Sequence, residues 1–406
     1  MTRTLMLGSL LALSAAGAVS LPGVNCASDP QNARCTLRTS PADFGLIGSG
    51  PAFYTGGFTD SVGSGFVDAA ENALYVPFEA GGQMDDLGGV IRVDLNTGDR
   101  TLVSGKISDL EQRGKGVTYV SDRGQNTSGW GLGRVLAVRP GPAGSVYALT
   151  NYGSSYRTEI LRIDKATGNR TLVWANRLAD DATSSSNPNS IQNQEARLGI
   201  NPGTLCGRAP ANPSSFEVYG GNIYVGSNGS VMKIVPGVSC AFISQYEADG
   251  TVLKGDGPAV KTSVLIGSSL LGNELTMTTG PGATWLTATN LDTGTRRVIS
   301  GFDQSRPRQG PGTGDAWVGY LGTHAAGQNV IATTGYNGIT DFTVTVVDRK
   351  TGNRTVLEGK GSLKRGRTSN MGVIANIPGT DSFVVWYERT LHVWDARTGD
   401  AYILSQ

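Results

Sequence analysis

Six polar residues occupy one matched position in a strand pattern that recurs along the chain. They lie four residues after the aligned strand position and are Glu79, Asn151, Asn228, Thr279, Thr334 and Glu388. Carboxylate and amide oxygens suit a hard cation such as Ca²⁺. We therefore predict that any divalent cation, Ca²⁺ or another, is held by Glu79, Asn151, Asn228 and Glu388. Such a set leaves coordination positions for water, as Lewis-acid activation of a carbonyl requires.

Only two histidines are available for acid–base chemistry. His324 lies in LGTHAAG, at the approach to the fifth repeat unit, and is a candidate functional residue. His392 alternates with Leu391 and Val393, so we predict that it faces outward from a strand. Neither histidine lies in a G-x-S-x-G context typical of a serine nucleophile. The sequence therefore leaves open whether this protein is an enzyme.

A ten-residue pattern, repeated five times, belongs to the elements that position these residues. The copies are DLNTGDRTLV (94–103), DKATGNRTLV (164–173), NLDTGTRRVI (290–299), DRKTGNRTVL (348–357) and DARTGDAYIL (395–404). Alternating or apolar runs flank four of the copies, which predicts β-hairpins. The leading Asp or Asn accepts hydrogen bonds from turn amides, and the glycine supplies the positive φ that closes the turn. Turn geometry thus explains the repeat without a repeated ligand site.

Two further short strands precede each hairpin, which gives about four strands per unit and six units. This pattern predicts an all-β fold, a six-bladed β-propeller of four-stranded antiparallel blades over residues 45–406. A polar insertion at residues 175–215 interrupts it. We expect every Thr-Gly turn to lie on the face opposite the candidate metal ligands.

The recurring strand and hairpin resemble NHL-repeat propellers, together with G-x-G-P connectors such as Gly48-Ser49-Gly50-Pro51 and Gly255-Asp256-Gly257-Pro258. They are also similar to the gluconolactonase-like (strictosidine-synthase-like) group of six-bladed propellers. The resemblance covers roughly residues 45–406 and implies architecture, because the group contains enzymes, ligand binders and scaffolds. Gluconolactonase-like enzymes hold a divalent metal in the central channel with Glu, Asn and Asp ligands. The nearest match to their ligand segments here is Asn228-Gly229, and Asp60 is a candidate acidic partner.

The N-terminus has the pattern of an export signal. Arg3 supplies a positive charge, residues 5–19 are apolar and nearly uncharged, and Ala18 and Ser20 suit a cleavage site. We therefore predict a signal peptide over residues 1–20 and a secreted, periplasmic or cell-surface protein. No other segment is long and apolar enough to predict a transmembrane segment in the mature protein. A net charge of +1 argues against a nucleic-acid partner.

Four cysteines remain after the predicted cleavage, two of them in the N-terminal segment 21–44. An even number in an exported protein predicts disulfides, and three connectivities are possible. Proximity in the sequence favours Cys26–Cys35 and Cys206–Cys240. The spacings do not match a zinc site.

Two classes of function remain open. The leading hypothesis is an exported binding or scaffold module whose upper face takes a protein, small-molecule or carbohydrate ligand. The alternative is a metal-dependent hydrolase of lactones or esters, or a lyase, with a divalent cation in the central channel. The poor match to the family's metal ligands and the scarcity of histidine favour the first.

Overall fold

The computed structural model describes most of the ring and part of the N-terminal segment. The described residues are 18–35, 47–51, 63–78, 87–108, 110–116, 132, 134–152, 157–175, 215–227, 230–246, 252–258, 264–280, 283–303, 311–314, 320–336, 342–357, 361–363, 371–387 and 390–406. The predicted polar insertion at 175–215 therefore lies almost wholly outside them.

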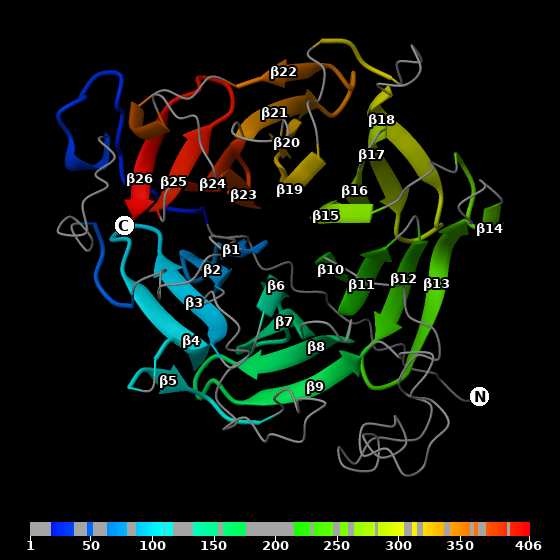
Figure 1. Ribbon diagram of the computed structural model, residues 1–406, viewed down its shortest axis with the longest axis horizontal. Coiled ribbons are helices and arrows are strands. Elements are labelled where there is room, and N and C mark those ends of the chain that lie inside the picture. The colour runs from blue at the N-terminus through cyan, green and yellow to red at the C-terminus, as the bar shows by residue number, and fades with distance from the viewer. Residues whose placement is uncertain are drawn as a thin grey trace, which may run out of the picture.

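The structure confirms the predicted six-bladed β-propeller, with the blades following one another around a ring (Figure 1). Blade 1 holds β1 (Phe66–Asp68), β2 (Ala73–Phe78), β3 (Gly88–Asp94), β4 (Arg100–Lys106) and β5 (Gln112–Arg113). Blade 2 holds β6 (Arg134–Pro140), β7 (Ser145–Tyr152), β8 (Arg157–Asp164) and β9 (Arg170–Ala175). Blade 3 holds β10 (Ser215–Tyr219), β11 (Asn222–Ser227), β12 (Ser230–Val235), β13 (Ser239–Tyr246) and β14 (Val252–Lys254).

The remaining three blades have four strands each. Blade 4 holds β15 (Val264–Leu271), β16 (Glu274–Gly280), β17 (Ala283–Asn290) and β18 (Arg296–Asp303). Blade 5 holds β19 (Tyr320–Ala326), β20 (Val330–Tyr336), β21 (Phe342–Asp348) and β22 (Arg354–Val356). Blade 6 holds β23 (Met371–Asn376), β24 (Ser382–Tyr387), β25 (Thr390–Asp395) and β26 (Ala401–Ser405). Short 3-10 helices are η1 (Ala33–Cys35) and η4 (Gly361–Leu363). The prediction of four strands per blade is thus exceeded in blades 1 and 3.

Within each blade the strands pair antiparallel in chain order, and the first strand is innermost (Figure 1). The links from first to second and from third to fourth strand therefore emerge on one face, which we call the lower face. The links from second to third strand emerge on the opposite, upper face. Every Thr-Gly turn joins a third to a fourth strand and so lies on the lower face, as expected.

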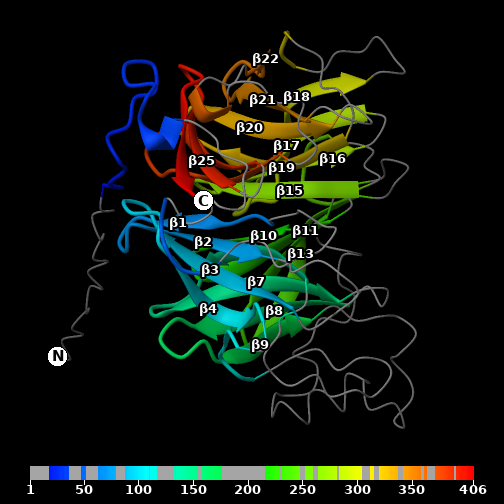
Figure 2. The same ribbon diagram turned by 60° about the vertical axis from the view of Figure 1, so that its left-hand side comes forward.

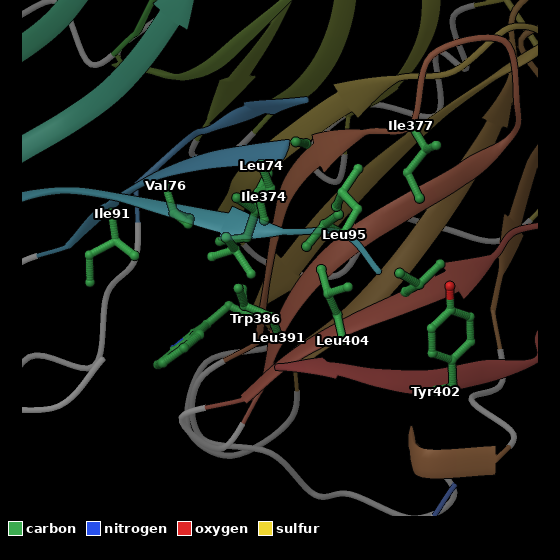
Figure 3. Close-up of a cluster of buried hydrophobic side chains, with 14 of the residues drawn as sticks. Leu74, Val76, Ile91, Leu95, Ile374, Ile377, Trp386, Leu391, Tyr402 and Leu404 are labelled. Atoms are coloured by element: carbon green, nitrogen blue, oxygen red, sulfur yellow. The ribbon is translucent and has the colours of Figure 1, made fainter. Parts of the chain in front are cut away.

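Burial on both sides of a blade explains the continuous apolar strands. All six residues of β2 are buried, because each blade is packed between two neighbours. Apolar clusters fill the seams between adjacent blades. Figure 3 shows the cluster between blades 1 and 6, where Leu74 and Ile91 meet Trp386 and Leu404.

The Thr-Gly turns have the predicted Asx geometry. The Asp94 Oδ1 accepts hydrogen bonds from the amides of Asn96 and Thr97, at 2.9 and 3.1 Å. Gly98 closes the turn at φ 84°, and its amide donates to the carbonyl of Asp94. A β-carbon on Gly98 would lie 2.3 Å from the Leu404 carbonyl oxygen, so glycine is also required by the neighbouring blade.

The same motif also fastens blade to blade, which goes beyond the prediction that it is only a turn. Ser405 of blade 6 donates its hydroxyl to the Gly98 carbonyl at 2.7 Å, and the Arg100 guanidinium donates to that hydroxyl at 2.7 Å. Arginines at the corresponding position contact a serine of the preceding blade at three other seams: Arg170 to Ser104, Arg296 to Ser244 and Arg354 to Ser300. These four arginines are buried. We call each Arg–Ser pair a clasp.

The disulfide bonding of the described cysteines agrees with the prediction from the sequence. Cys26 and Cys35 are joined, as predicted. Cys240 is disulfide-bonded, while its predicted partner Cys206 lies outside the described residues. Cys240 in the fourth strand of blade 3 pairs with Ile234 in the third strand. The same position of the fourth strand is occupied by the clasp arginine in other blades, as Arg100 in blade 1, which pairs with Val93, shows. A covalent bond therefore stands at the clasp position of blade 3.

Candidate functional site

The candidate ligand positions lie at the upper ends of second strands. Strands β2, β11 and β24 end one residue before Glu79, Asn228 and Glu388, which themselves lie outside the described residues. Asn151 is in β7, where its backbone pairs with Arg134 and Thr158, but its side chain is not described. The described ends of β2, β11 and β24 therefore lie on the same face as the end of β7 that holds Asn151, and the metal site remains a prediction.

The two faces of the ring differ in the lengths of their links. On the lower face, each link between strands is two to five residues long in all six blades. The segments that lead from one blade to the inner strand of the next, which starts at the upper face, include residues 114–133, 176–214 and 304–319. The described parts of two of these segments contact lower-face turns: the Lys115 amide donates to the Asn169 Oδ1 and the Thr313 amide donates to the Asn353 Oδ1, both at 2.9 Å. The links from second to third strand, on the upper face, span two to nine residues, so their length varies more than that of the lower-face links.

A buried ion pair joins the inner strands at the centre of the ring. Arg139 of β6 and Glu217 of β10 approach to 2.6 Å, with side chains 5% and 7% exposed. Arg139 also donates to the Ser64 hydroxyl and to the carbonyls of Ser64 and Gly65, just before β1. The Gly65 amide in turn donates to the carbonyl of Ile374 in β23. This network ties blades 1, 2, 3 and 6 together, and breaking one partner would leave a buried charge uncompensated.

A second charged cluster links blades 1 and 2 on the lower face. The Lys165 ammonium donates to Asp68 at 2.9 Å and to Glu71 at 2.6 Å, and it lies 4.7 Å from the centre of the Tyr75 ring. Burial and the hydrogen bond to Glu71 raise the pKa of Tyr75 to about 12. Burial lowers the pKa of Lys165, but its bonds to Glu71 and Asp68 outweigh that effect and raise it. Lys165 therefore stays charged and acts as a bridge between blades, not as a nucleophile.

The prediction for His392 is wrong. Its side chain is fully buried in β25, because the third strand of a blade is covered on both faces. Its Nδ1 lies 2.9 Å from the hydroxyl of Ser362 in η4, and its ring lies 5.8 Å from that of Tyr387. Burial lowers the pKa of His392 to about 3. A serine next to a histidine is the arrangement of an activated nucleophile, but both side chains are buried, so the pair fastens η4 to blade 6.

The other histidine, His324, lies in an inner strand of the ring. His324 is in β19, the innermost strand of blade 5, where its backbone pairs with Thr333. Its side chain is not described, so its functional role remains a prediction. Within the described part of the chain, no three or more His, Cys, Asp or Glu side chains gather as a metal site would require.

These observations define the chain as a six-bladed β-propeller. No protein-family profile matches the sequence, and no curated protein matches it. Membership of the NHL-repeat or gluconolactonase-like group therefore remains a prediction.

Three solved structures follow most of the chain at low sequence identity. The crystal structure of the computationally designed Ika8 protein is 13% identical, with a TM-score of 0.39 over 87% of this chain and 89% of its own. The structure of U3-55K is 11% identical, with a TM-score of 0.44 over 86% and 82%. The WD40 repeats of RRP9 are 11% identical, with a TM-score of 0.44 over 86% and 81%. Because these TM-scores are low, the fold assignment rests on the blades of this chain itself.

Proposed function

We propose that this protein is an exported binding or scaffold propeller that takes its ligand on the upper face. The observation that carries the proposal is the contrast between the two faces. The links of the lower face are two to five residues long, whereas those from second to third strand on the upper face span two to nine residues. Binding residues are disproportionately found on variable loops held by a rigid scaffold.

The ring has the rigidity that such a scaffold needs. Four Arg–Ser clasps and the buried pair of Arg139 and Glu217 fix neighbouring blades against each other. Amide and carboxylate residues lie at or directly after the upper ends of second strands, at Glu79, Asn151, Asn228 and Glu388, and we propose that they contact the ligand. Such groups supply the directional hydrogen bonds by which a protein or carbohydrate ligand is recognised.

Two observations support export. Residues 1–20 have the composition of a signal peptide, and Cys26 and Cys35 form a disulfide, which persists in oxidising compartments. In the part of the chain that the structure describes, no helix is long and apolar enough to cross a membrane.

The proposal is tested by altering one face at a time. The upper-face variant combines Glu79→Ala, Asn151→Ala and Glu388→Ala. The matched lower-face variant replaces three exposed turn residues, Asn96→Ala, Asp292→Ala and Arg397→Ala. Both are compared with the unaltered protein on a carbohydrate array and by cross-linking to the other proteins of its own compartment.

We expect a specific ligand to be lost from the upper-face variant and retained by the lower-face variant. Loss of ligand binding by the lower-face variant alone would place the binding surface on the lower face and refute the proposal. Failure of the unaltered protein to bind either class of probe would also count against it.

The matched register of four oxygen-bearing residues favours one alternative, a metal-dependent hydrolase. In that case equilibrium dialysis against Ca²⁺ gives about one ion per chain, and Asn228→Ala or Glu388→Ala releases it. Hydrolysis of a lactone or ester by the loaded protein would then support the alternative. Absence of Ca²⁺ binding, or binding that survives both substitutions, removes this residue set from consideration.

A further inference from the structure

The seam between blades 6 and 1 differs from every other seam in its connectivity. Blade 1 comes first in the chain and blade 6 last, so no connector runs directly from blade 6 to blade 1. Each described sheet consists of strands that are consecutive in the chain, so no strand is shared across this seam. The ring must therefore be closed there by side chains and by the segment that precedes blade 1.

That segment crosses from blade 1 onto blade 6. The Arg34 guanidinium donates to the carbonyls of Ile403 and Leu404 in β26, at 2.9 and 3.0 Å. Its other nitrogen donates to the carbonyls of Asn96 and Thr97 in the blade 1 turn, at 3.2 and 3.1 Å. One side chain thus holds four backbone oxygens, two from each side of the seam.

The disulfide and its loop position this arginine. Arg34 immediately precedes Cys35, whose bond to Cys26 closes a loop with a sequence separation of nine. Within the loop, the Asn32 carbonyl accepts from the Cys35 amide at 2.8 Å, and the Asn32 Oδ1 accepts from the Arg34 amide at 3.0 Å. The guanidinium is therefore held on a short, covalently closed loop instead of a free terminus.

Apolar contacts hold the same segment on the ring. Both cysteines are buried in the cluster that fills the seam, and Leu21 and Val24 pack against that cluster. Figures 1 and 2 show the segment as a blue loop beside β26, far from the inner strands. The predicted cleavage after Ser20 leaves all of these residues in the mature protein.

We propose that residues 21–35 form a strap that closes the ring, and that the Cys26–Cys35 disulfide keeps the strap in place. Reduction by two equivalents of a thiol would break the S–S bond and give two cysteine thiols, while the two reductant thiols are joined in their own disulfide. Arg34 would then lie on an open chain, and this chain would lose more conformational entropy when it docks on the ring. Opening of the 6–1 seam is thereby coupled to the redox state of one bond, independently of which ligand the propeller takes.

The test measures local opening by amide hydrogen exchange in the full-length mature protein. One variant is Cys26→Ser with Cys35→Ser, and another is Arg34→Ala, which retains the disulfide. The control is Arg397→Ala, an exposed arginine in the lower-face turn of blade 6. Peptides covering residues 94–98 and 401–406 report on the seam, and peptides covering residues 286–300 report on distant blade 4.

We expect exchange at the seam to accelerate about tenfold or more in both strap variants, with blade 4 and the control unchanged. Seam exchange equal to that of the unaltered protein in the Arg34→Ala variant would overturn the proposal. Equal acceleration in blade 4 would also overturn it, because the segment would then contribute only general stability. If the double cysteine variant does not fold, the Arg34→Ala variant still decides between these outcomes. Loss of ligand binding is not part of the readout, so failure of the proposed function leaves this test unaffected.

Discussion

Acidification is expected to destabilise the protein through His392 over a defined pH range. The side chain is fully buried, and burial lowers its pKa from 6.5 to about 3. The folded protein therefore keeps this imidazole neutral at pH values where an unfolded chain would protonate it. Because the unfolded state binds more protons below pH 6.5, the free energy of unfolding falls as the pH is lowered from 6.5 towards 3.

The magnitude at pH 5 depends only on the unfolded pKa, because the folded pKa lies well below that pH. One pKa unit corresponds to about 1.4 kcal/mol, and pH 5 lies about 1.5 units below the unfolded value. His392 should thus account for a loss of about 2 kcal/mol between pH 7.5 and pH 5. Other titrating groups add their own losses, so the effect has to be measured as a difference between variants.

The assay is denaturant unfolding of the unaltered protein and His392→Asn at both pH values. Asparagine keeps a polar atom near the Ser362 hydroxyl and does not titrate. The variant is expected to be less stable at pH 7.5, where it leaves a cavity, but to lose about 2 kcal/mol less on acidification. The His324→Asn variant measures how much of the loss of stability on acidification comes from the other histidine. Parallel losses in the unaltered protein and His392→Asn would show that His392 titrates alike in both states and would refute the reasoning.

Two further predictions concern the blade contacts. Gly98→Ala and Gly144→Ala both place a β-carbon at positive φ, but only Gly98 has a neighbouring carbonyl within 4 Å of that carbon. Gly144→Ala should therefore cost about 1–2 kcal/mol and Gly98→Ala about 1–3 kcal/mol more, and equal losses in thermal unfolding would contradict the close contact between blades. Peptide mapping without reduction should recover Cys206 linked to Cys240, whereas a free thiol at Cys206 in the mature protein would rule this pairing out.

The architecture could be predicted because turns and strand periods are local properties. An Asx residue four positions before a glycine specifies its turn whatever surrounds it, so Asp94 and Gly98 behave as predicted. The sequence pattern did not predict the clasps, because Arg100 occupies what is ordinarily an exposed polar position in an alternating strand. The available signal was the recurrence of arginine two residues after the turn glycine in four copies, and of serine six residues after that glycine in Ser104, Ser300 and Ser405.

The error at His392 has a general physical cause. Alternation distinguishes a buried from a solvated face only when one face of the sheet meets water. The third strand of a propeller blade is covered on both faces, so its alternate positions are both buried. The central pair of Arg139 and Glu217 could not be predicted for a related reason. The two residues are 78 positions apart, and only the packing of blade 3 against blade 2 brings their strands together.

The strap also has a consequence for the order in which the chain folds. Arg34 and its acceptor Leu404 are 370 residues apart, so Arg34 is synthesised long before its partner. Blades 1 to 5 can each pack against a predecessor while the rest of the chain is still emerging, but the final seam must wait for β26. Contacts of such long range are slow to form. We expect the last step of folding to be the docking of an already oxidised loop onto the last strand, with the apolar edges of blades 1 and 6 exposed until then.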